Sequence, residues 1–271
     1  MNCSVVRDQR IHHRRFFVLA EQIGDGWVEF APAQARQMTQ VLRLRPGDEV
    51  TVFDGTGREI VAALATTTPR RARARVLREI ARPTPLAVSV TLAQVMPRGG
   101  AMDLVVGKAT ELGVSRIVPL EAERSVRRAT ARDPRWRRIV QEAAEQCGRP
   151  DLPKLEPILP LQEFLCRHPA GIPLVACESA EGSRPLALVC QDLRHVTRLT
   201  LLVGGEGGFS PGELERLRVH GARLASLGPR LLRAETAALA ALAIVQAILG
   251  DWGPEGTAGR TPGSPQRPEV P

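Results

Sequence analysis

The stretch Leu201-Leu-Val-Gly-Gly-Glu-Gly-Gly-Phe-Ser-Pro-Gly-Glu213 joins an apolar segment to a helix start through nearly bare backbone. Thr200 to Val203 are predicted as a buried strand, and Ser210 and Glu213 form a capping box with Pro211 at the first helical position. Four glycines lie between strand and helix. Because glycine lets backbone N–H and C=O groups approach a bound molecule, the loop is predicted to bind a ligand at the carboxyl end of its strand.

The same arrangement of strand, glycine-bearing loop and helix recurs in Leu227-Gly-Pro-Arg-Leu-Leu-Arg-Ala-Glu-Thr-Ala237. Gly221 is predicted as the C′ residue that ends the helix between the two stretches. The helix from Ala234 to Leu249 is rich in Ala and Leu on most faces, so it is expected to be buried, with Gly250 ending it. Two adjacent loops are therefore predicted to face one crevice.

Other ligand motifs fit the first loop poorly. Gly204 to Gly212 matches neither the dinucleotide fingerprint nor the phosphate loop in register. Gly208-Phe-Ser-Pro-Gly212 does match G-x-S-x-G, the nucleophile elbow of α/β hydrolases. That elbow needs the backbone N–H of the residue after the serine, and Pro211 has none. The pattern therefore argues against a hydrolase.

Elements upstream alternate in a way typical of a mainly parallel α/β sheet. Strands are predicted from Leu86 to Val95 and from Ser115 to Leu120, and helices from Ala101 to Leu112 and from Pro134 to Cys147. The segment Ala81 to Pro85 carries two prolines in three residues and is predicted to be a stiff linker. We expect one domain over 1–80, the linker over 81–85, an α/β domain over 86–252, and a disordered tail over 253–271.

The first domain alternates short apolar runs with turn signals, which indicates a small β-barrel with one helix from about Ala33 to Leu42. Strands are expected at Phe16–Ala20, Trp27–Phe30, Glu49–Phe53, Glu59–Leu64 and Ala72–Leu77. Within Arg71-Ala-Arg-Ala-Arg-Val76 the arginines alternate, so a strand places Arg71, Arg73 and Arg75 on one face. That face is either a phosphate-tracking surface or a charged, solvated edge.

Composition narrows the class of partner. The 271 residues are 43% hydrophobic and carry a net charge of +8, which favours a polyanion such as RNA, although the arginine bias of a GC-rich genome gives the same charge. A second basic surface is expected in the stretch from Arg124 to Arg138, unless it is a solvated face. Five scattered cysteines predict neither disulfides nor a zinc site. With no apolar run of about twenty residues, the protein is expected to be cytosolic and not membrane-bound.

Three charged residues stand out at the two loops. Glu206 either orients a substrate or lies near the positive end of the following helix. Arg233 and Glu235 stand at the second junction between loop and helix, where a cation stabilises negative charge and a carboxylate accepts a proton. The alternative is a surface ion pair that contributes little. In the same way, Lys108 and Glu111 are one turn apart and are expected to pair.

Five motifs in order resemble the SPOUT superfamily of knotted RNA methyltransferases, and within it the bacterial family that methylates N3 of a uridine in 16S ribosomal RNA. Besides the two loops, these are Val41-Leu-Arg-Leu-Arg-Pro-Gly-Asp48, Lys108-Ala-Thr-Glu-Leu-Gly-Val-Ser115 and Glu142-Ala-Ala-Glu-Gln-Cys-Gly-Arg149. Order and spacing agree from about Arg14 to Asp251. The resemblance implies a trefoil-knotted α/β domain, a small PUA-like RNA-binding barrel and a homodimer.

The resemblance also implies the chemistry and its residues. S-adenosylmethionine is the expected methyl donor, no metal is expected, and the expected substrate is the decoding-region helix 44 of 16S rRNA in the small ribosomal subunit. The expected catalytic residues are Arg233, Glu235 and Glu206. The expected cofactor-binding residues are Leu202, Val203, Gly204, Gly205, Glu206, Gly207, Gly208, Leu227, Gly228, Arg230, Leu231, Leu232 and Thr236. The expected RNA-binding residues are Arg14, Arg43, Arg71, Arg73, Arg75, Arg124 and Arg149.

Two positions depart from the family pattern. Gly205 stands where the family usually has proline, which removes a φ constraint from the loop. Gln37 stands where a histidine often precedes the Val-Leu-Arg motif. These departures leave open an alternative, a ribosome-binding or assembly factor that has the fold without the activity.

Overall fold

The computed structural model describes residues 14–80, 87–125 and 133–252, so the predicted linker and tail lie outside the described residues. The chain divides into two compact units. The first comprises the described residues up to 80 together with 141–152, and the second comprises the described residues of 87–140 and 153–252. Residues 141–152 are the second half of one helix and the loop after it, so the first unit includes a segment from the middle of the sequence.

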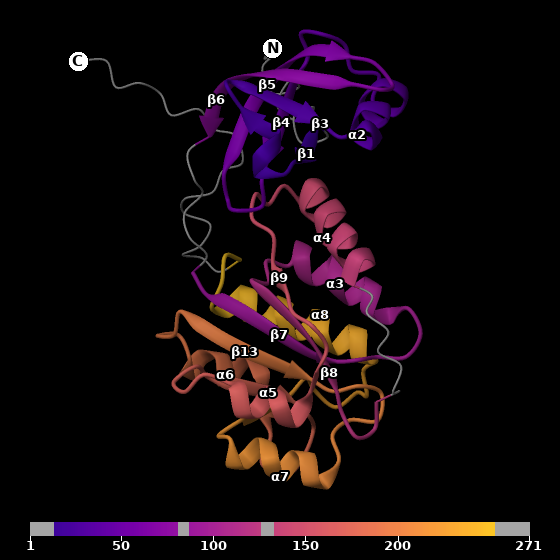
Figure 1. The fold of residues 1–271 in the computed structure, drawn as a ribbon. Helices are drawn as coiled ribbons and strands as arrows, with labels where there is room; N and C mark the ends of the chain where they lie inside the picture. Colours follow the sequence, from indigo (N-terminus) through magenta and orange to yellow (C-terminus); the bar gives the residue numbers. More distant parts are fainter. Residues whose placement is uncertain (1–13, 81–86, 126–132, 253–271) are drawn as a thin grey trace, which may run out of the picture. The chain divides into compact units, whose positions relative to one another are not determined.

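The first unit is built on a mixed sheet (Figure 1). Its six strands have the order β1-β4-β5-β6-β3-β2. β1 and β4 are parallel, and the other neighbours are antiparallel. The strands are β1 (Arg15–Phe17), β2 (Ile23–Gly24), β3 (Trp27–Phe30), β4 (Glu49–Phe53), β5 (Glu59–Thr67) and β6 (Ala72–Ile80). The expected starts of β3 to β6 are confirmed. The short β2 and the 3-10 turn η1 (Ala20–Gln22) are additional, so the strand expected to reach Ala20 ends at Phe17.

The single predicted helix of this unit has two parts, α2 (Pro32–Arg36) and the π-helical η2 (Gln37–Val41). Met38 and Ala35 face the core, in which Phe16 and Phe30 meet edge to face at 5.8 Å. The segment 141–152 joins this unit through Glu145, whose Oε1 accepts a hydrogen bond from the Phe17 N–H at 2.8 Å.

The second unit contains a sheet in which every pair of neighbouring strands is parallel. Its order is β10-β8-β7-β13-β11-β14-β12, with β9 beside β8. The strands are β7 (Ser89–Val95), β8 (Arg116–Glu121), β9 (Lys154–Leu155), β10 (Leu159–Pro160), β11 (Leu174–Cys177), β12 (Arg184–Pro185), β13 (Arg198–Val203) and β14 (Arg223–Ser226). β13 therefore lies between two strands that both precede it in the chain.

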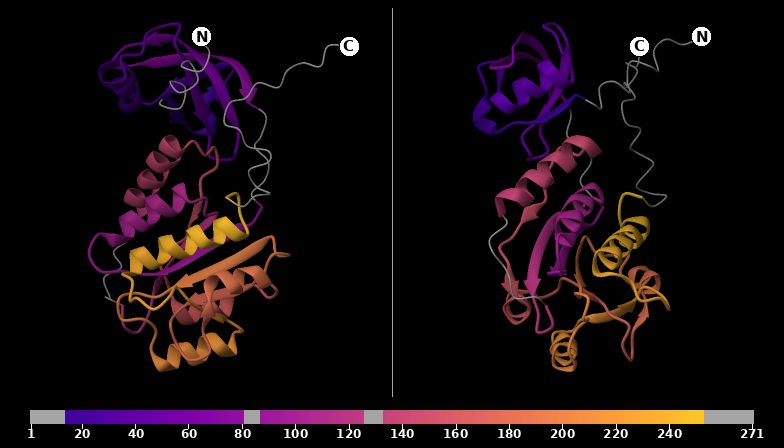
Figure 2. Two further views of the ribbon diagram at one scale, coloured as in Figure 1. Left: turned by 180° about the vertical axis from the view of Figure 1, so that it is seen from behind. Right: turned by 90° about the vertical axis from the view of Figure 1, so that its right-hand side faces the viewer.

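Helices cover both faces of this sheet (Figures 1 and 2). α5 (Leu161–Arg167) and α7 (Pro211–Val219) pack on one face, through a core that includes Phe164, Leu217 and Leu202. α3 (Ala101–Glu111) and α8 (Ala234–Ile248) pack together on the other face. The remaining helices are α4 (Asp133–Cys147) and α6 (Leu186–Asp192). The predicted helices at α3, α4, α7 and α8 are confirmed, whereas α5, β11 and α6 had no strong pattern and were not predicted.

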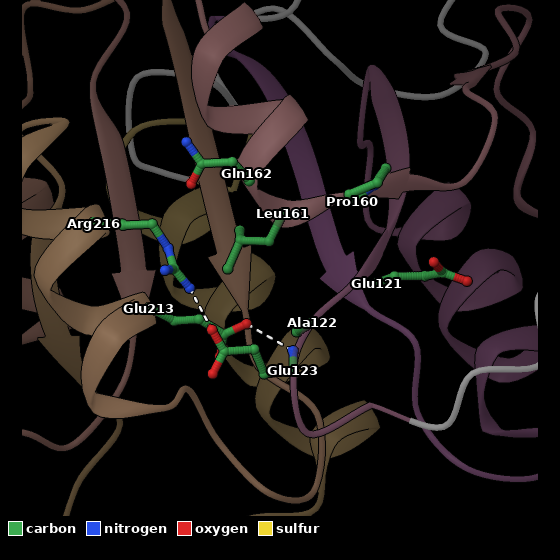
Figure 3. Close-up of a pocket in the computed structure, with 8 residues that line it drawn as sticks. All are labelled: Glu121, Ala122, Glu123, Pro160, Leu161, Gln162, Glu213 and Arg216. Atoms are coloured by element: carbon green, nitrogen blue, oxygen red, sulfur yellow. Dashed lines mark hydrogen bonds and ion pairs between the residues drawn. The ribbon is translucent and has the colours of Figure 1, made fainter.

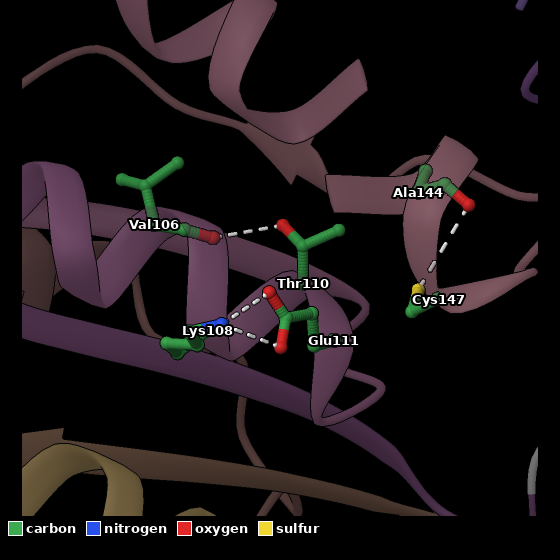
Figure 4. A network of polar contacts seen from close by, with 6 residues as sticks. All are labelled: Val106, Lys108, Thr110, Glu111, Ala144 and Cys147. Atoms are coloured by element: carbon green, nitrogen blue, oxygen red, sulfur yellow. Dashed lines mark hydrogen bonds and ion pairs between the residues drawn. The ribbon is translucent and has the colours of Figure 1, made fainter. Parts of the chain in front are cut away.

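Local sequence explains where the helices begin and end. Ser210 Oγ accepts from Glu213 N at 3.2 Å, with Pro211 at the start of α7, as predicted. Gly221 follows the helix with φ +72°. In α3, Lys108 pairs with Glu111 at 2.7 Å, and Thr110 Oγ1 donates to the Val106 carbonyl one turn earlier (Figure 4).

Candidate cofactor and RNA site

The carboxyl ends of β7, β13, β11 and β14 share one edge of the parallel sheet. The glycine loop, residues 204–209, follows β13, and the second loop, residues 227–233, follows β14. Both loops lie at this edge, as predicted. The strands that carry them are not neighbours, because β11 lies between β13 and β14. Nothing in the local sequence reveals that an earlier strand lies between the two strands that carry these loops.

Glu178, the residue after β11, connects the two sides of this edge. Its backbone N–H donates to the Ala225 carbonyl of β14 at 2.9 Å. Its carboxylate accepts from the backbone N–H of Phe209 in the glycine loop at 3.2 Å. Sequence reasoning missed Glu178, since a single carboxylate after an unpredicted strand gives no signal of its own.

Close contacts with neighbouring side chains explain why two positions of the first loop are glycine. A Cβ on Gly208 would lie 3.0 Å from Glu178 Oε2, and this residue also has φ +60°. A Cβ on Gly207 would lie 3.0 Å from Arg124 Cβ. Side chains at these two positions would collide with Arg124 and Glu178, so glycine allows these two residues to lie close to the loop backbone.

Beneath the loop lies Gln94, a fully buried amide on β7. Its Nε2 donates to the Val95 carbonyl at 2.8 Å and to the Gly204 carbonyl at 3.2 Å. Its Oε1 is buried and has no hydrogen-bond partner among the described residues. Open glycine backbone together with an unpaired buried acceptor fits a ligand rich in N–H and O–H groups, which an adenosine moiety provides.

The second loop is open to solvent. Gly228 has φ +104°, and its N–H donates to Ser226 Oγ at 3.1 Å. Arg230 is exposed and the Leu231 side chain is 100% exposed, while Leu227 and Leu232 are half-buried. Among the other expected cofactor residues, Thr236 is exposed on α8, whereas Leu202 and Val203 point into the core and offer only backbone groups.

The three expected catalytic residues differ in how they are held. Arg233 is the N-cap residue of α8, with an exposed side chain that has no hydrogen bond or ion pair within the described parts of the chain. Glu235 lies half-buried in the first turn of the same helix. Glu206 is exposed, but its Oε1 accepts from the Arg98 N–H at 2.7 Å, which ties the glycine loop to the segment after β7. The alternative, a surface ion pair between Arg233 and Glu235, is not formed in the described structure.

A hollow of about 720 Å³ opens between α5, α7 and the end of β8 (Figure 3). It is lined by Glu121, Ala122, Glu123, Pro160, Leu161, Gln162, Glu213 and Arg216. Glu213 is 1% exposed and accepts from the Glu123 N–H at 2.8 Å, and Arg216 pairs with the Glu123 carboxylate at 2.6 Å. None of the expected cofactor-binding residues lines this hollow.

The expected RNA-binding arginines of the first unit are partly neutralised. Arg73 and Arg75 alternate on β6 with buried alanines, as predicted. Glu29 pairs with Arg73 at 2.8 Å and with Arg71 at 3.4 Å, and Arg73 also lies over the Trp27 ring at 4.0 Å. The remaining expected contacts are Arg14, which pairs with Asp48 at 3.4 Å, Arg149, which pairs with Asp151 at 2.6 Å, and the exposed Arg43.

The second basic stretch is only partly described, because Arg127, Arg128 and Arg132 lie outside the described residues. Arg124 donates to the Gly207 carbonyl at 3.0 Å, and Arg135 pairs with Asp103 at 2.6 Å. Trp136 is buried and donates to the same aspartate at 2.9 Å, so its ring packs inside the unit and is not available to stack on a base.

The described structure gives little support for a cysteine nucleophile, a metal site or a membrane-spanning helix. Burial raises the pKa of the Cys177 thiol at the end of β11 to about 12, so this group is protonated near neutral pH and is a poor nucleophile. Within the described ranges no group of three or more His, Cys, Asp or Glu residues is arranged to hold a metal ion. The same ranges contain no helix that is long and apolar enough to cross a membrane.

Comparison with known proteins gives a consistent result. The family model of an RNA methyltransferase domain matches residues 84–246, and that of an RNA methyltransferase PUA domain matches residues 33–77. The chain is 33% identical over 238 residues to Ribosomal RNA small subunit methyltransferase E of Synechocystis sp., covering 87% of this chain and 78% of that protein.

Solved structures resemble this chain over most of its length. Ribosomal RNA small subunit methyltransferase E from Neisseria gonorrhoeae, bound to S-adenosyl methionine, aligns with TM-score 0.79 and 34% identity, covering 89% of this chain and 99% of that one. A putative methyltransferase from Legionella pneumophila, in complex with the same cofactor, aligns with TM-score 0.77 and 29% identity, covering 88% and 98%. The predicted fold class, a parallel α/β domain with a PUA-like N-terminal domain, is confirmed.

Proposed function

Because this chain belongs to the RNA methyltransferase family, we propose that it methylates N3 of a uridine in helix 44 of 16S ribosomal RNA. S-adenosylmethionine is the methyl donor, as in the two similar structures that contain it. The substrate is the small ribosomal subunit, so the protein acts in the cytoplasm. The observation that carries the proposal is the pair of open loops at one sheet edge, with the unpaired Arg233 at the second of them.

The cofactor is held mainly by backbone groups. S-adenosylmethionine supplies an electrophilic methyl group on a sulfonium, so the transfer is an in-line displacement that depends on positioning. The backbone of Gly204 to Gly208 and of Leu227 to Leu232 holds its adenosine part, and the exposed Arg230, Leu231 and Thr236 border the same site. The unpaired Gln94 Oε1 lies under this loop as an additional acceptor.

The uracil needs both charge stabilisation and proton removal. The N3 imide nitrogen is a poor nucleophile until its proton leaves, and negative charge then develops on the ring. Arg233 stabilises that charge, since its guanidinium is exposed and uncommitted among the described residues. Glu235 accepts the proton, because Glu206 is already engaged by the Arg98 N–H and is better suited to holding the loop.

Positive charge on the first unit guides the RNA. In this proposal six arginines contact phosphates, which fits the net charge of +8. They are Arg14, Arg43, Arg71, Arg73, Arg75 and Arg149. Arg71 and Arg73 exchange Glu29 for phosphate when RNA binds. The protein acts as a homodimer; Leu104 on α3, 46% exposed, and the half-buried Leu239 and Ile244 on α8 supply apolar surface for association.

The decisive test is methyl transfer to small subunits purified from a strain that lacks this gene. Labelled S-adenosylmethionine is supplied, and the nucleosides of the recovered 16S rRNA are separated and analysed by mass spectrometry. Labelled N3-methyluridine mapped to helix 44 supports the proposal. Label in another nucleoside overturns the target, and absence of both label and cofactor binding favours a non-catalytic ribosome-binding factor. Light scattering that finds a stable monomer contradicts the dimer.

A further inference from the structure

The glycine loop has few internal restraints. The Gly208 N–H donates to the Gly205 carbonyl at 3.1 Å, and no other backbone hydrogen bond joins two residues of 204–209 among the described residues. A segment with four glycines loses more conformational entropy on ordering than ordinary residues do. Contacts from outside the loop must therefore keep it in one conformation.

A buried carboxylate provides one such contact. Glu213 is 1% exposed, and its two oxygens accept hydrogen bonds from two different segments. Oε2 accepts from the Ser210 N–H at the end of the glycine loop, and Oε1 accepts from the Glu123 N–H just after β8, both at 2.8 Å. Because a buried carboxylate is costly without partners, this arrangement fixes the two segments to each other (Figure 3).

The next residue then reaches the middle of the loop. Arg124 Nη1 donates to the Gly207 carbonyl at 3.0 Å. The stem of Arg124 also covers Gly207, since a Cβ built there would lie 3.0 Å from Arg124 Cβ and 3.3 Å from its Cδ. A charged donor and an apolar stem thus cover one side of a loop that has no side chains of its own at 207 and 208.

A third contact fixes the residue that precedes Arg124. The Glu123 carboxylate pairs with Arg216 of α7 at 2.6 Å. Hydrogen bonds from Ser210 and then Arg216 lower the pKa of Glu123, so it is ionised at neutral pH. Residues 122–124 are therefore attached to α7 at two points as well as to the glycine loop.

We infer that Arg124 is a positioning residue of the cofactor loop, held in place by Glu213 and Glu123, rather than a simple phosphate contact. Its hydrogen bond to Gly207 restricts the loop that carries no φ constraint at Gly205. This inference rests on the proposed function, because it takes the glycine loop as the cofactor site. Loss of Arg124 then weakens cofactor binding even when RNA is absent.

The test compares Arg124→Ala with Arg198→Ala, an exposed arginine at the opposite end of β13. Cofactor binding is measured by calorimetry without RNA, and hydrogen exchange is measured on peptides covering 204–210 of the cofactor-free protein. Arg124→Ala is expected to weaken S-adenosylmethionine binding by roughly threefold to tenfold, as for loss of one exposed charged hydrogen bond. Exchange in the loop is expected to accelerate, and Arg198→Ala is expected to leave both quantities unchanged.

A rescue variant separates loop restraint from RNA contact. We expect Gly205 to accept proline, because its φ lies outside the positive region and its N–H donates no hydrogen bond among the described residues. A Cβ there would meet Val95 Cγ1 at an acceptable 3.4 Å. Adding Gly205→Pro to Arg124→Ala is expected to restore most of the lost cofactor affinity. The inference is overturned if Arg124→Ala leaves cofactor binding and loop exchange unchanged while the salt dependence of RNA binding falls by about one phosphate contact.

The result is distinguishable from a failure of the proposed function. If the native protein binds no S-adenosylmethionine, the function fails, but loop exchange in the cofactor-free protein still reports on Arg124. Glu213→Gln adds a second comparison, since it keeps the size of the side chain and one oxygen acceptor. Glu213 is buried, so Glu213→Gln could fold poorly. In that case Arg124→Ala alone tests the inference, because the Arg124 side chain is at the surface.

Discussion

Glu178 and Phe209 are 31 residues apart in sequence, yet the Glu178 carboxylate accepts the Phe209 backbone N–H at 3.2 Å. This bond crosses from the end of β11 to the glycine loop after β13. The same carboxylate oxygen occupies the position next to Gly208, where a Cβ would lie 3.0 Å away. The conformation of the loop and the placement of Glu178 are therefore mutually dependent.

Gly208→Ala is expected to destabilise the protein by about 1–2 kcal/mol, because a non-glycine residue at φ +60° is strained. The added Cβ also displaces the Glu178 carboxylate, so S-adenosylmethionine binding should be lost or greatly weakened. Gly212→Ala is the matched control. It lies in the first turn of α7, where a Cβ would make only ordinary contacts at 3.7 Å, and alanine there is expected to stabilise by about 0.4–1 kcal/mol. Chemical denaturation and calorimetry test both; equal effects of the two substitutions would contradict this explanation.

Arg43 is expected to lower the stability of the protein and to contribute to RNA binding. It has φ +53° after η2, in the position where helices commonly end with glycine. Arg43→Gly should raise the unfolding free energy by about 1 kcal/mol and lower RNA affinity, with a salt slope smaller by about one. Asp25→Gly is the control, because Asp25 has φ +51° and should stabilise similarly without weakening RNA binding. If both variants bind RNA like the native protein, Arg43 is not a phosphate contact.

Arg233→Ala is expected to lower the methyl-transfer rate roughly 100-fold to 1,000-fold, the usual cost of losing one donor to developing charge. S-adenosylmethionine affinity should change by less than about twofold, since the proposed role of Arg233 is at the uracil. Single-turnover rates and calorimetry measure the two effects. A variant that loses cofactor affinity in proportion to rate would assign Arg233 to the cofactor instead.

Glu235→Gln should also slow transfer, by roughly 100-fold or more, if the carboxylate accepts the N3 proton. The glutamine amide cannot take up a proton, so the variant should lose this proton transfer while S-adenosylmethionine still binds. Glu206→Gln is the comparison, because its amide oxygen still accepts from the Arg98 N–H and should preserve most of the rate. The reverse order of effects would exchange the roles of the two glutamates.

Glu145 is expected to make the first unit less stable as pH rises. Its burial, reinforced by the neighbouring Glu142, raises the pKa of its carboxyl group above 4.5. The folded state therefore binds more protons than the unfolded state in the pH range just above 4.5, and the unfolding free energy falls as pH increases through that range. Glu145→Gln keeps an acceptor for the Phe17 N–H and should flatten this dependence, whereas the exposed Glu21→Gln should not. Denaturant titrations at several pH values measure the difference.

Local sequence determines where several of the helices and strands of this fold begin and end. The capping box of Ser210 and Glu213, the C′ glycine at 221 and the Ala-rich run of α8 act over a few residues, and they correctly predict where helices begin and end. The period-two arginines likewise predict the exposed face of β6. Such signals survive without tertiary contacts because the backbone bonds and φ preferences involved are satisfied within one turn or one strand.

The order of the strands and the residues that contact the loops could not be predicted from local sequence. By itself, the sequence determined that two glycine loops end two strands and open two helices. Only the tertiary structure placed β11 between those strands, and with it Glu178 between the loops. Only it brought Arg124 to Gly207, 83 residues away, and Glu213 to Glu123, 90 residues away. Parallel strands exchange hydrogen bonds through backbone groups that every residue carries, so their order leaves no residue-specific mark in local sequence.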